Sequence, residues 1–205
     1  MKDSPISQLS PAELIAVAYE FHPQLGDLSQ YSMEEYNKAF WHSAEQIALS
    51  RVQRAGYARL EEWQRLCRAV AQAIPRAYTM ADRTYPRYDP AYVIVVDAPS
   101  EPGSIEERFL VVHVSYLVPY YFYYESHSRR IDGQIQRDPL LYEVTPVFKD
   151  VLAAIEREIG TRYGYWRMPP EVALIDAPGL EINGFHDWET RPPTLQEALF
   201  TPHRW

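Results

Sequence analysis

Cysteine is almost absent from this sequence, because Cys67 is the only one in 205 residues. No disulfide can form within the chain, and a metal site built on several thiolates is excluded. Cys67 also falls on the apolar stripe of a predicted helix, where a small buried hydrophobic residue is more common than a reactive thiol. We therefore expect Cys67 to be structural.

Glycine is scarce as well, and the eight glycines form none of the patterns that bind nucleotides. The sequence has no G-x-G dinucleotide fingerprint, no P-loop and no G-x-S-x-G turn that would present a nucleophilic serine. The HEXXH spacing of a zinc hydrolase is missing too. We therefore expect no cofactor and no metal, and a binding role rather than a catalytic one.

Long apolar runs are missing, and so is an excess of positive charge. No stretch approaches the about 20 apolar residues of a membrane span, and residues 1–21 lack the apolar core of a signal peptide. The net charge of −8 at pH 7 argues against a nucleic-acid partner, which would need a positive surface. We expect a cytoplasmic protein that contacts neither membrane nor nucleic acid.

Acidic residues gather between positions 171 and 197, where Arg191 is the only basic residue. A negative segment speeds encounter with a basic partner, because opposite potentials steer association. A solubilising surface is the alternative interpretation. The carboxylates are Glu171, Asp176, Glu181, Asp187, Glu189 and Glu197.

Helix signals recur in the first 75 residues. The stretches Ser10–Glu13 and Ser32–Glu35 each place a glutamate three residues after a serine, which is the capping-box pattern. An apolar stripe at helical spacing follows each of them. The second stripe runs from Tyr36 through Ile47 to Val52, and Ala55-Gly56 predicts the helix end. A further apolar stripe from Leu60 to Ile74 predicts a helix that ends before Pro75.

Beyond residue 90 the pattern changes to apolar runs typical of strands. Residues 92–97 and 108–118 flank a Pro/Gly loop and predict a β-hairpin, while 75–90 predicts a connector. Thr145-Pro146 predicts the start of an inserted helix that ends at Gly160. Further strands are predicted at 140–144, 171–177 and 180–182, and a capping box at 194–197 predicts a last short helix.

The order of these elements predicts an α+β fold. Helices come first, and a mainly antiparallel sheet with an inserted helix follows. We expect one domain over residues 1–205, with a helical part at 1–75 and a sheet-containing part at 91–205.

The stretch "VSYLVPYYFYYESHSRR" (114–130) combines five consecutive aromatic residues with Pro119. As one continuous strand it places Val114 on one face, and Tyr121, Tyr123 and Glu125 on the other. Proline cannot donate to a sheet ladder, so we expect a bulge or a switch to a sheet edge at Pro119. The aromatic rings could all be core, or Tyr121 and Tyr123 could face a partner, since tyrosine is enriched at interfaces.

Polar residues that could carry chemistry lie in three places. His113 in mid-strand predicts a hydrogen-bonded core histidine. Arg129 and Arg130 could hold a phosphate or carboxylate, or belong to a solvated loop. The cluster "FHDWET" (185–190) places His186, Asp187 and Glu189 around Trp188, and such groups can bind metals or transfer protons, although His186 has no second histidine at i+4.

A short acidic α+β chain with an aromatic strand such as "YLVPYYFYYE" and an acidic segment such as "FHDWETRPPTLQEALF" resembles bacterial immunity proteins of polymorphic or contact-delivered toxin systems. The resemblance lies in overall character, not in an aligned motif, so it assigns no individual residue. It implies that the protein occludes a cognate toxin without catalysis of its own. Many such toxins are nucleases with basic clefts, which suits an acidic surface.

The sequence thus predicts a protein-binding inhibitor with aromatic anchors inside an acidic rim. One alternative is an enzyme or small-ligand-binding protein with a pocket of tyrosines and His113, His127 or His186. Another is an assembly subunit with a large exposed apolar patch. The partner-binding residues of the first hypothesis are Tyr121, Tyr123, Glu125, Asp187, Trp188 and Glu189.

Overall fold

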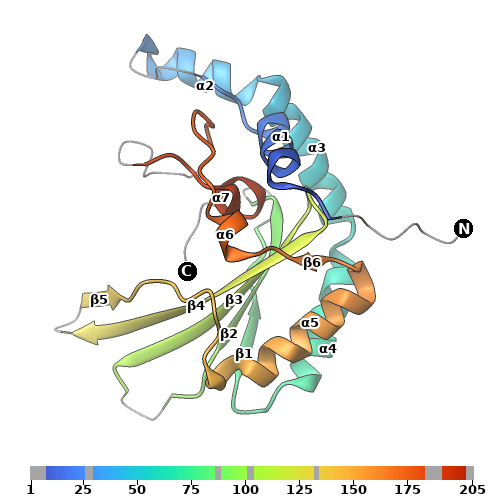
Figure 1. Cartoon of the computed structure of the whole chain (residues 1–205), viewed down its shortest axis with the longest axis vertical. Coiled ribbons are helices and arrows are strands. Elements are labelled where there is room, and N and C mark those ends of the chain that lie inside the picture. The colour runs from blue at the N-terminus through green and yellow to red at the C-terminus, as the bar shows by residue number, and fades with distance from the viewer. Residues whose placement is uncertain are drawn as a thin grey trace, which may run out of the picture.

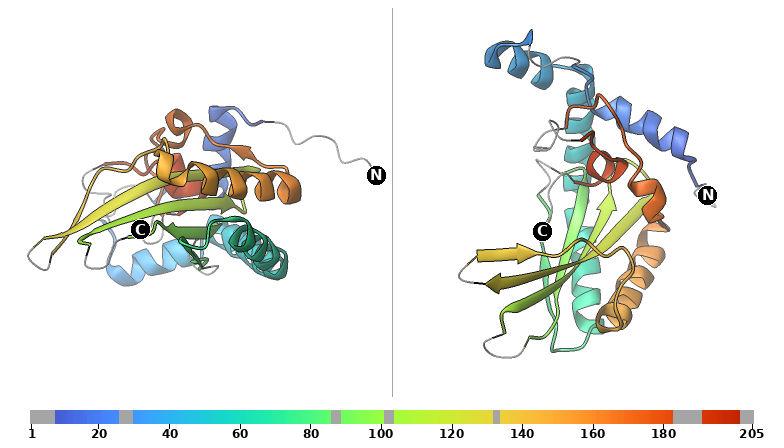
Figure 2. Two further views of the ribbon diagram at one scale, coloured as in Figure 1. Left: turned by 90° about the horizontal axis from the view of Figure 1, so that it is seen from below. Right: turned by 60° about the vertical axis from the view of Figure 1, so that its left-hand side comes forward.

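The computed structural model describes residues 8–25, 30–85, 89–100, 104–131, 134–182 and 191–201. Its architecture is α+β, as the sequence predicts (Figure 1). N-terminal helices come first, an antiparallel sheet follows, and a long helix and short C-terminal helices complete the chain. Figure 2 shows the twisted sheet and its covering helices from two further directions.

The N-terminal helices begin where the sequence predicts. At Ser10 and Ser32 the serine hydroxyl accepts the backbone N–H of the glutamate three residues on, and that glutamate's carboxylate accepts the backbone N–H of the serine, so both capping boxes form. Gly56 does not end its helix, which continues for two more residues with Gly56 buried. The four helices are α1 (Pro11–Phe21), α2 (Met33–Trp41), α3 (Ala44–Ala58) and α4 (Leu60–Ala73).

Five strands form an antiparallel sheet in the order β1-β2-β3-β4-β5. The predicted hairpin is β2 and β3, while β1 lies inside the segment that we expected to be a connector. A sixth short strand, β6 (Trp166–Arg167), pairs in parallel with β4. The five are β1 (Thr79–Asp82), β2 (Ala91–Asp97), β3 (Glu106–Ser115), β4 (Tyr120–Ile131) and β5 (Gln134–Arg137).

Pro119 lies in the turn between β3 and β4, not at a bulge within one long strand. Because the chain reverses there, Val114 pairs with Tyr121, and Val112 pairs with Tyr123. Paired residues of neighbouring strands point to the same face of a sheet. The turn therefore corrects the predicted faces: the two tyrosines share the face of Val114 and do not oppose it.

Both faces of the sheet are buried, each under its own hydrophobic cluster. One cluster joins Trp63 of α4 and Ile155 of α5 (Lys149–Tyr163) to the face that carries Tyr121 and Tyr123. The other packs α1, α6 (Pro170–Ala173) and α7 (Leu195–Leu199) on the face that carries Phe122. Each residue of β2 from Ala91 to Val96 is accordingly buried, as expected for a strand covered on both sides.

Two predictions about the segment after β4 hold. A helix does start at Thr145-Pro146, as the 3₁₀ turn η2 (Pro146–Phe148) that leads into α5. The capping box at Thr194 forms and opens α7. Gly160, however, does not end α5, because the helix runs to Tyr163 and stops at Gly164, whose φ of 64° is the left-handed conformation that glycine tolerates.

The strands predicted in this segment do not form. Residues 140–144 contribute only one bridge, between Leu141 and Glu125. Residues 171–177 were predicted as a strand, but Pro170 occupies the first position of helix α6 and a single bridge joins Asp176 to Thr194. Residues 180–182 lie outside any strand as well. The apolar run there packs against the sheet instead of extending it.

Within the described ranges, no helix is both long enough and apolar enough to cross a lipid bilayer.

Candidate functional site

The two tyrosines predicted as partner anchors lie inside the protein. Tyr121 is 7% exposed and Tyr123 is 4% exposed. The Tyr121 hydroxyl donates to Glu156 Oε1 of α5 at 2.9 Å, and the Arg167 guanidinium of β6 lies 4.3 Å from the centroid of the Tyr123 ring. The turn before β4 directs both rings beneath α5 and β6, which corrects the expectation that they form a surface.

Glu125, predicted as part of an acidic rim, is completely buried and fully engaged. Its Oε2 accepts the backbone N–H of Thr145 at 2.8 Å, and its Oε1 accepts the Thr145 hydroxyl at 2.9 Å. His127 Nε2 lies 2.5 Å from the same Oε1. Thr145 is the residue from which η2 and α5 start, so this carboxylate fixes that helix start to β4 and does not meet a partner.

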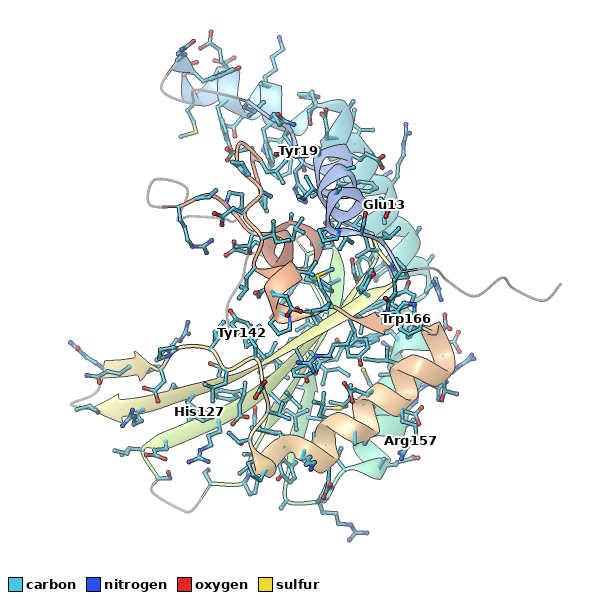
Figure 3. All side chains as sticks on the ribbon, in the orientation of Figure 1. Glu13, Tyr19, His127, Tyr142, Arg157 and Trp166 are labelled. Atoms are coloured by element: carbon cyan, nitrogen blue, oxygen red, sulfur yellow. The ribbon has the colours of Figure 1, made fainter. Side chains whose placement is uncertain are left out.

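The Glu125–His127 pair also has the form of a catalytic carboxylate–imidazole dyad, with His127 on β4 (Figure 3). In a catalytic triad the nucleophilic hydroxyl bonds the imidazole, so that the imidazole can take its proton. Here the Thr145 hydroxyl bonds the carboxylate. The arrangement therefore holds the backbone in place but does not activate a nucleophile.

The other three predicted anchors, Asp187, Trp188 and Glu189, lie outside the described residues, and so does His186. The described segments that precede and follow these residues each make a side-chain contact with another part of the protein. Before them, Glu181 Oε1 accepts the Tyr36 hydroxyl of α2 at 2.8 Å. After them, both terminal nitrogens of Arg191 bond the carboxylate of Glu197.

Glu197 does not belong to an acidic surface, although it counts in the acidic segment of the sequence. Its side chain is 2% exposed and forms the capping box of α7 with Thr194. Burial alone would raise the pKa of this carboxyl. The hydrogen bonds from Arg191 and Thr194 outweigh burial, so the pKa is lowered and the group is a carboxylate.

His113 and His127 do not converge on a pocket, because they point to opposite faces of the sheet. His113 lies between the rings of Tyr124 and Phe200, with ring centroids 5.7 and 6.4 Å away. Neither imidazole nitrogen has a hydrogen-bond partner in the described structure, which corrects the expectation of a hydrogen-bonded histidine. Burial lowers the pKa of His113 to about 3, so the ring is neutral.

Metal-ligating side chains do not cluster in the part of the chain that the structure describes, where no group of three or more His, Cys, Asp or Glu could hold an ion.

The helices α2 and α3 carry exposed apolar side chains that the sequence pattern did not predict. Met33 is 75% exposed and Trp41 is 51% exposed, on a helix that projects from the body of the protein (Figure 1). Ile47 is exposed as well, although it was assigned to a buried stripe. The chain breaks between the helices at Ser43, which caps α3, and this break shifts the phase of the stripe. We call Tyr31, Met33, Trp41 and Ile47 the arm surface.

Carboxylates accompany the arm surface. Between residues 30 and 49 the chain has three glutamates and one lysine, so this segment carries a net charge of −2 (−3 + 1) apart from His42. Glu181 joins them through its hydrogen bond to Tyr36. The arm surface therefore combines exposed apolar side chains with negative charge. The charged residues of the segment are Glu34, Glu35, Lys38 and Glu45.

A tyrosine-lined pocket does form among the described residues, but without His113 or His127 in its lining. It lies between α3, the ends of β2 and β3, and the end of α5, with a volume of about 110 Å³. Its tyrosines are Tyr92, Tyr116, Tyr163 and Tyr165, and none of the described residues that line it is a histidine.

No protein-family model, no curated protein and no solved structure matches this chain.

Proposed function

We propose that this chain is a protein-binding inhibitor of the immunity type, which neutralises a cognate basic toxin by covering its active site. The supporting observation is the exposure of Met33 and Trp41 on a projecting helix that also carries carboxylates. Apolar patches exposed on a protein surface mark interaction sites, and tryptophan is among the residues that contribute most to binding energy.

The shape of α2 suits insertion into a cleft. The helix projects beyond the sheet in Figure 1 and in the right-hand view of Figure 2. Its inner side is fixed by Phe40, which is buried and stacks with Tyr36 at 5.8 Å between ring centroids. Trp41 packs edge-on against Phe40 at 4.9 Å. An anchor that is already held in place loses less side-chain entropy on binding.

Charge supports the choice of a basic partner. The chain carries −8 in total and the arm segment contributes −2 of it (−3 + 1). Complementary charge at an interface mainly speeds association, and salt screens this effect. We expect the association rate to fall as salt is added, while the dissociation rate changes little.

In this proposal the arm surface contacts the toxin, which is the role that the sequence predicted for Tyr121, Tyr123 and Glu125. Asp187, Trp188 and Glu189 remain predicted members of the acidic rim. The nearest described residues before them contact α2 through Glu181.

The test is calorimetric titration of the purified chain with the toxin domain encoded by the neighbouring gene. Trp41→Ala is expected to weaken binding at least about 30-fold, as for a typical hot-spot residue. Trp166→Ala is the matched control, because Trp166 is 43% exposed on β6, away from α2 (Figure 3). It should bind the toxin like the wild type.

Two results would overturn the proposal. One is a chain that forms no complex with that toxin domain at any salt concentration. The other is equal loss of affinity in Trp41→Ala and Trp166→Ala, because binding would then not depend on the arm surface. Circular dichroism on each variant confirms that the helices are retained.

A further inference from the structure

We propose that residues 194–201 form an acid-sensitive plug, which opens when two buried histidines take up protons while the opposite half of the protein stays folded. These residues comprise α7 and its flanks, and we call them the plug. They lie beside α1 and α6 on one face of the sheet (Figure 1). The plug shares no residue with the arm surface, so its opening can be measured without a toxin.

The plug is held mainly by burial. Each of its eight residues is buried. Its apolar side chains join the cluster that contains Leu14 of α1 and Phe122 of β4. Opening of the plug would therefore bring water to that face of the sheet and to the inner side of α1.

Side chains of the body hold the end of α7. The last carbonyl groups of a helix have no partner within the helix. Here the His22 side chain, through Nε2, bonds the carbonyl oxygen of Ala198 at 2.8 Å, and the Ser115 hydroxyl donates to the carbonyl oxygen of Leu199 at 2.7 Å. One of the two side chains that fix this end is thus titratable.

His22 has no place for a second proton while the plug is closed. A carbonyl oxygen only accepts, so Nε2 carries the hydrogen and a further proton would bind Nδ1. Nδ1 is buried and has no partner among the described residues. Burial lowers the pKa of His22 to about 4, although the bond to Ala198 by itself favours the cation. Protonation therefore favours the open plug.

His113 of β3 is the second histidine against the plug. Its ring lies 6.4 Å from that of Phe200, a plug residue, and neither of its nitrogens has a partner in the described structure. Burial lowers the pKa of His113 to about 3. A buried and unpaired charge is costly, and opening of the plug would supply the imidazolium with water.

The carboxylates near the plug do not neutralise the two histidines. Among the described residues, no charged side chain acts on the pKa of either one. The nearby buried or half-buried carboxylates have partners of their own: Glu197 bonds Arg191, Asp89 bonds Thr201, and Glu181 bonds Tyr36. The remaining carboxylates on α1, on α6 and just after α6 are exposed, namely Glu13, Glu20, Glu171 and Asp176.

The other half of the protein lacks this sensitivity. The cluster that joins Trp63 of α4 and Ile155 of α5 to the opposite face of the sheet contains no histidine among its described residues. Proteins open in separate units when the stabilities of those units differ. We therefore expect the plug to open in acid before α5 does.

The test is hydrogen exchange of the full chain at pH 7 and pH 5, measured by mass spectrometry and corrected for the intrinsic exchange rate. An open plug with ordinary histidines, compared with a closed plug that excludes their protons, should gain about 20-fold in population per histidine, and about 400-fold for both. The amides of α7 should lose protection by this factor, and those of α5 by far less. Glu197 does not contribute, because its pKa of 4.5 in the open state is lowered further when the plug is closed.

Two variants isolate the histidines. His22→Gln keeps a donor for the carbonyl oxygen of Ala198 and cannot take up a proton, and His113→Leu keeps an apolar contact for Phe200. Each should reduce the gain between pH 7 and pH 5 to about 20-fold. The control is His42→Gln, at an exposed position that follows α2, and it should keep the full gain of the wild type.

Three results would overturn the proposal. The first is equal protection of α7 at pH 7 and pH 5 in the wild type. The second is a parallel loss of protection in α7 and α5, because the protein would then unfold as one unit. The third is the full wild-type gain in both His22→Gln and His113→Leu, since the opening would then not depend on these histidines.

Discussion

Gly56 on α3 and Tyr116 after β3 are in such close contact that a Cβ built at residue 56 would lie 3.0 Å from three carbons of the tyrosine ring. So short an approach is tighter than nearly all real Cβ contacts, and the ring would have to move by a few tenths of an ångström to relieve it. The small size of glycine is therefore needed in the last turn of α3, although glycine within a helix is otherwise unfavourable.

The contact predicts opposite effects for two glycine-to-alanine changes in helices. Gly56→Ala should destabilise the protein by about 1–3 kcal/mol, because the methyl group overpacks the ring of Tyr116. Gly160→Ala on α5 should stabilise it by about 0.5–1 kcal/mol, since nothing lies within 4 Å of its Cβ position. Urea denaturation of both variants measures the difference. A change of the same sign in both would contradict the prediction.

Removal of the Glu125 side chain should be costly for stability. Glu125→Ala leaves the backbone N–H of Thr145 without its acceptor and opens a cavity, so we expect a loss of about 3 kcal/mol in the free energy of unfolding. Glu125→Gln keeps an acceptor for that N–H and should cost about 1 kcal/mol. Glu143→Ala, at an exposed position nearby, is the control and should change stability by less than about 0.5 kcal/mol. A loss in Glu125→Ala no larger than in this control would contradict the structural role.

Arg191→Ala should destabilise the protein at neutral pH by about 3 kcal/mol, because it removes the positive charge that neutralises the buried carboxylate of Glu197. The pKa of Glu197 is lowered in the folded protein from its usual 4.5. The stabilisation is therefore present above pH 4.5 and is lost as the pH falls through the lower, folded value. The difference between wild type and Arg191→Ala, measured by denaturation at several pH values, should shrink in acid. A constant difference would contradict this.

Two buried histidines predict a loss of stability in mild acid. Burial lowers the pKa of His22 to about 4 and that of His113 to about 3, from 6.5. Below pH 6.5 the unfolded chain binds protons that the folded chain does not, so each pH unit costs about 1.4 kcal/mol per histidine. The stability is complete above pH 6.5 and falls towards pH 4. His113→Leu should flatten this fall, and stability curves parallel to those of the wild type would contradict it.

The features that follow from neighbouring residues could be predicted from the sequence. The capping boxes at Ser10, Ser32 and Thr194 involve side chains three residues apart, and all three form. The faces of β3 follow from simple alternation and are correct up to Val114. After that point the length of the turn decides which way each side chain of β4 points. A prediction that simply continues the alternation of faces past Pro119 therefore assigns the side chains of β4 to the wrong faces.

The site depended on contacts between distant residues and was harder to predict. Composition drew attention to Tyr121 and Tyr123, but their burial depends on α5 and β6, which come later in the chain. The partner of Glu125 is Thr145, 20 residues away. Ile47 is exposed although the predicted stripe includes it, because the stripe was extended across Ser43, where a separate helix begins.

The packing of α1 against α7 has a consequence for the synthesis of the protein. His22 at the end of α1 bonds the carbonyl oxygen of Ala198 in α7 at 2.8 Å, across 176 residues of chain. The apolar side of α1 is thus synthesised well before α7, the helix that covers it. Until then Leu14 and Ala18 lack that cover, so the nascent chain offers chaperones an amphipathic helix that the finished protein conceals.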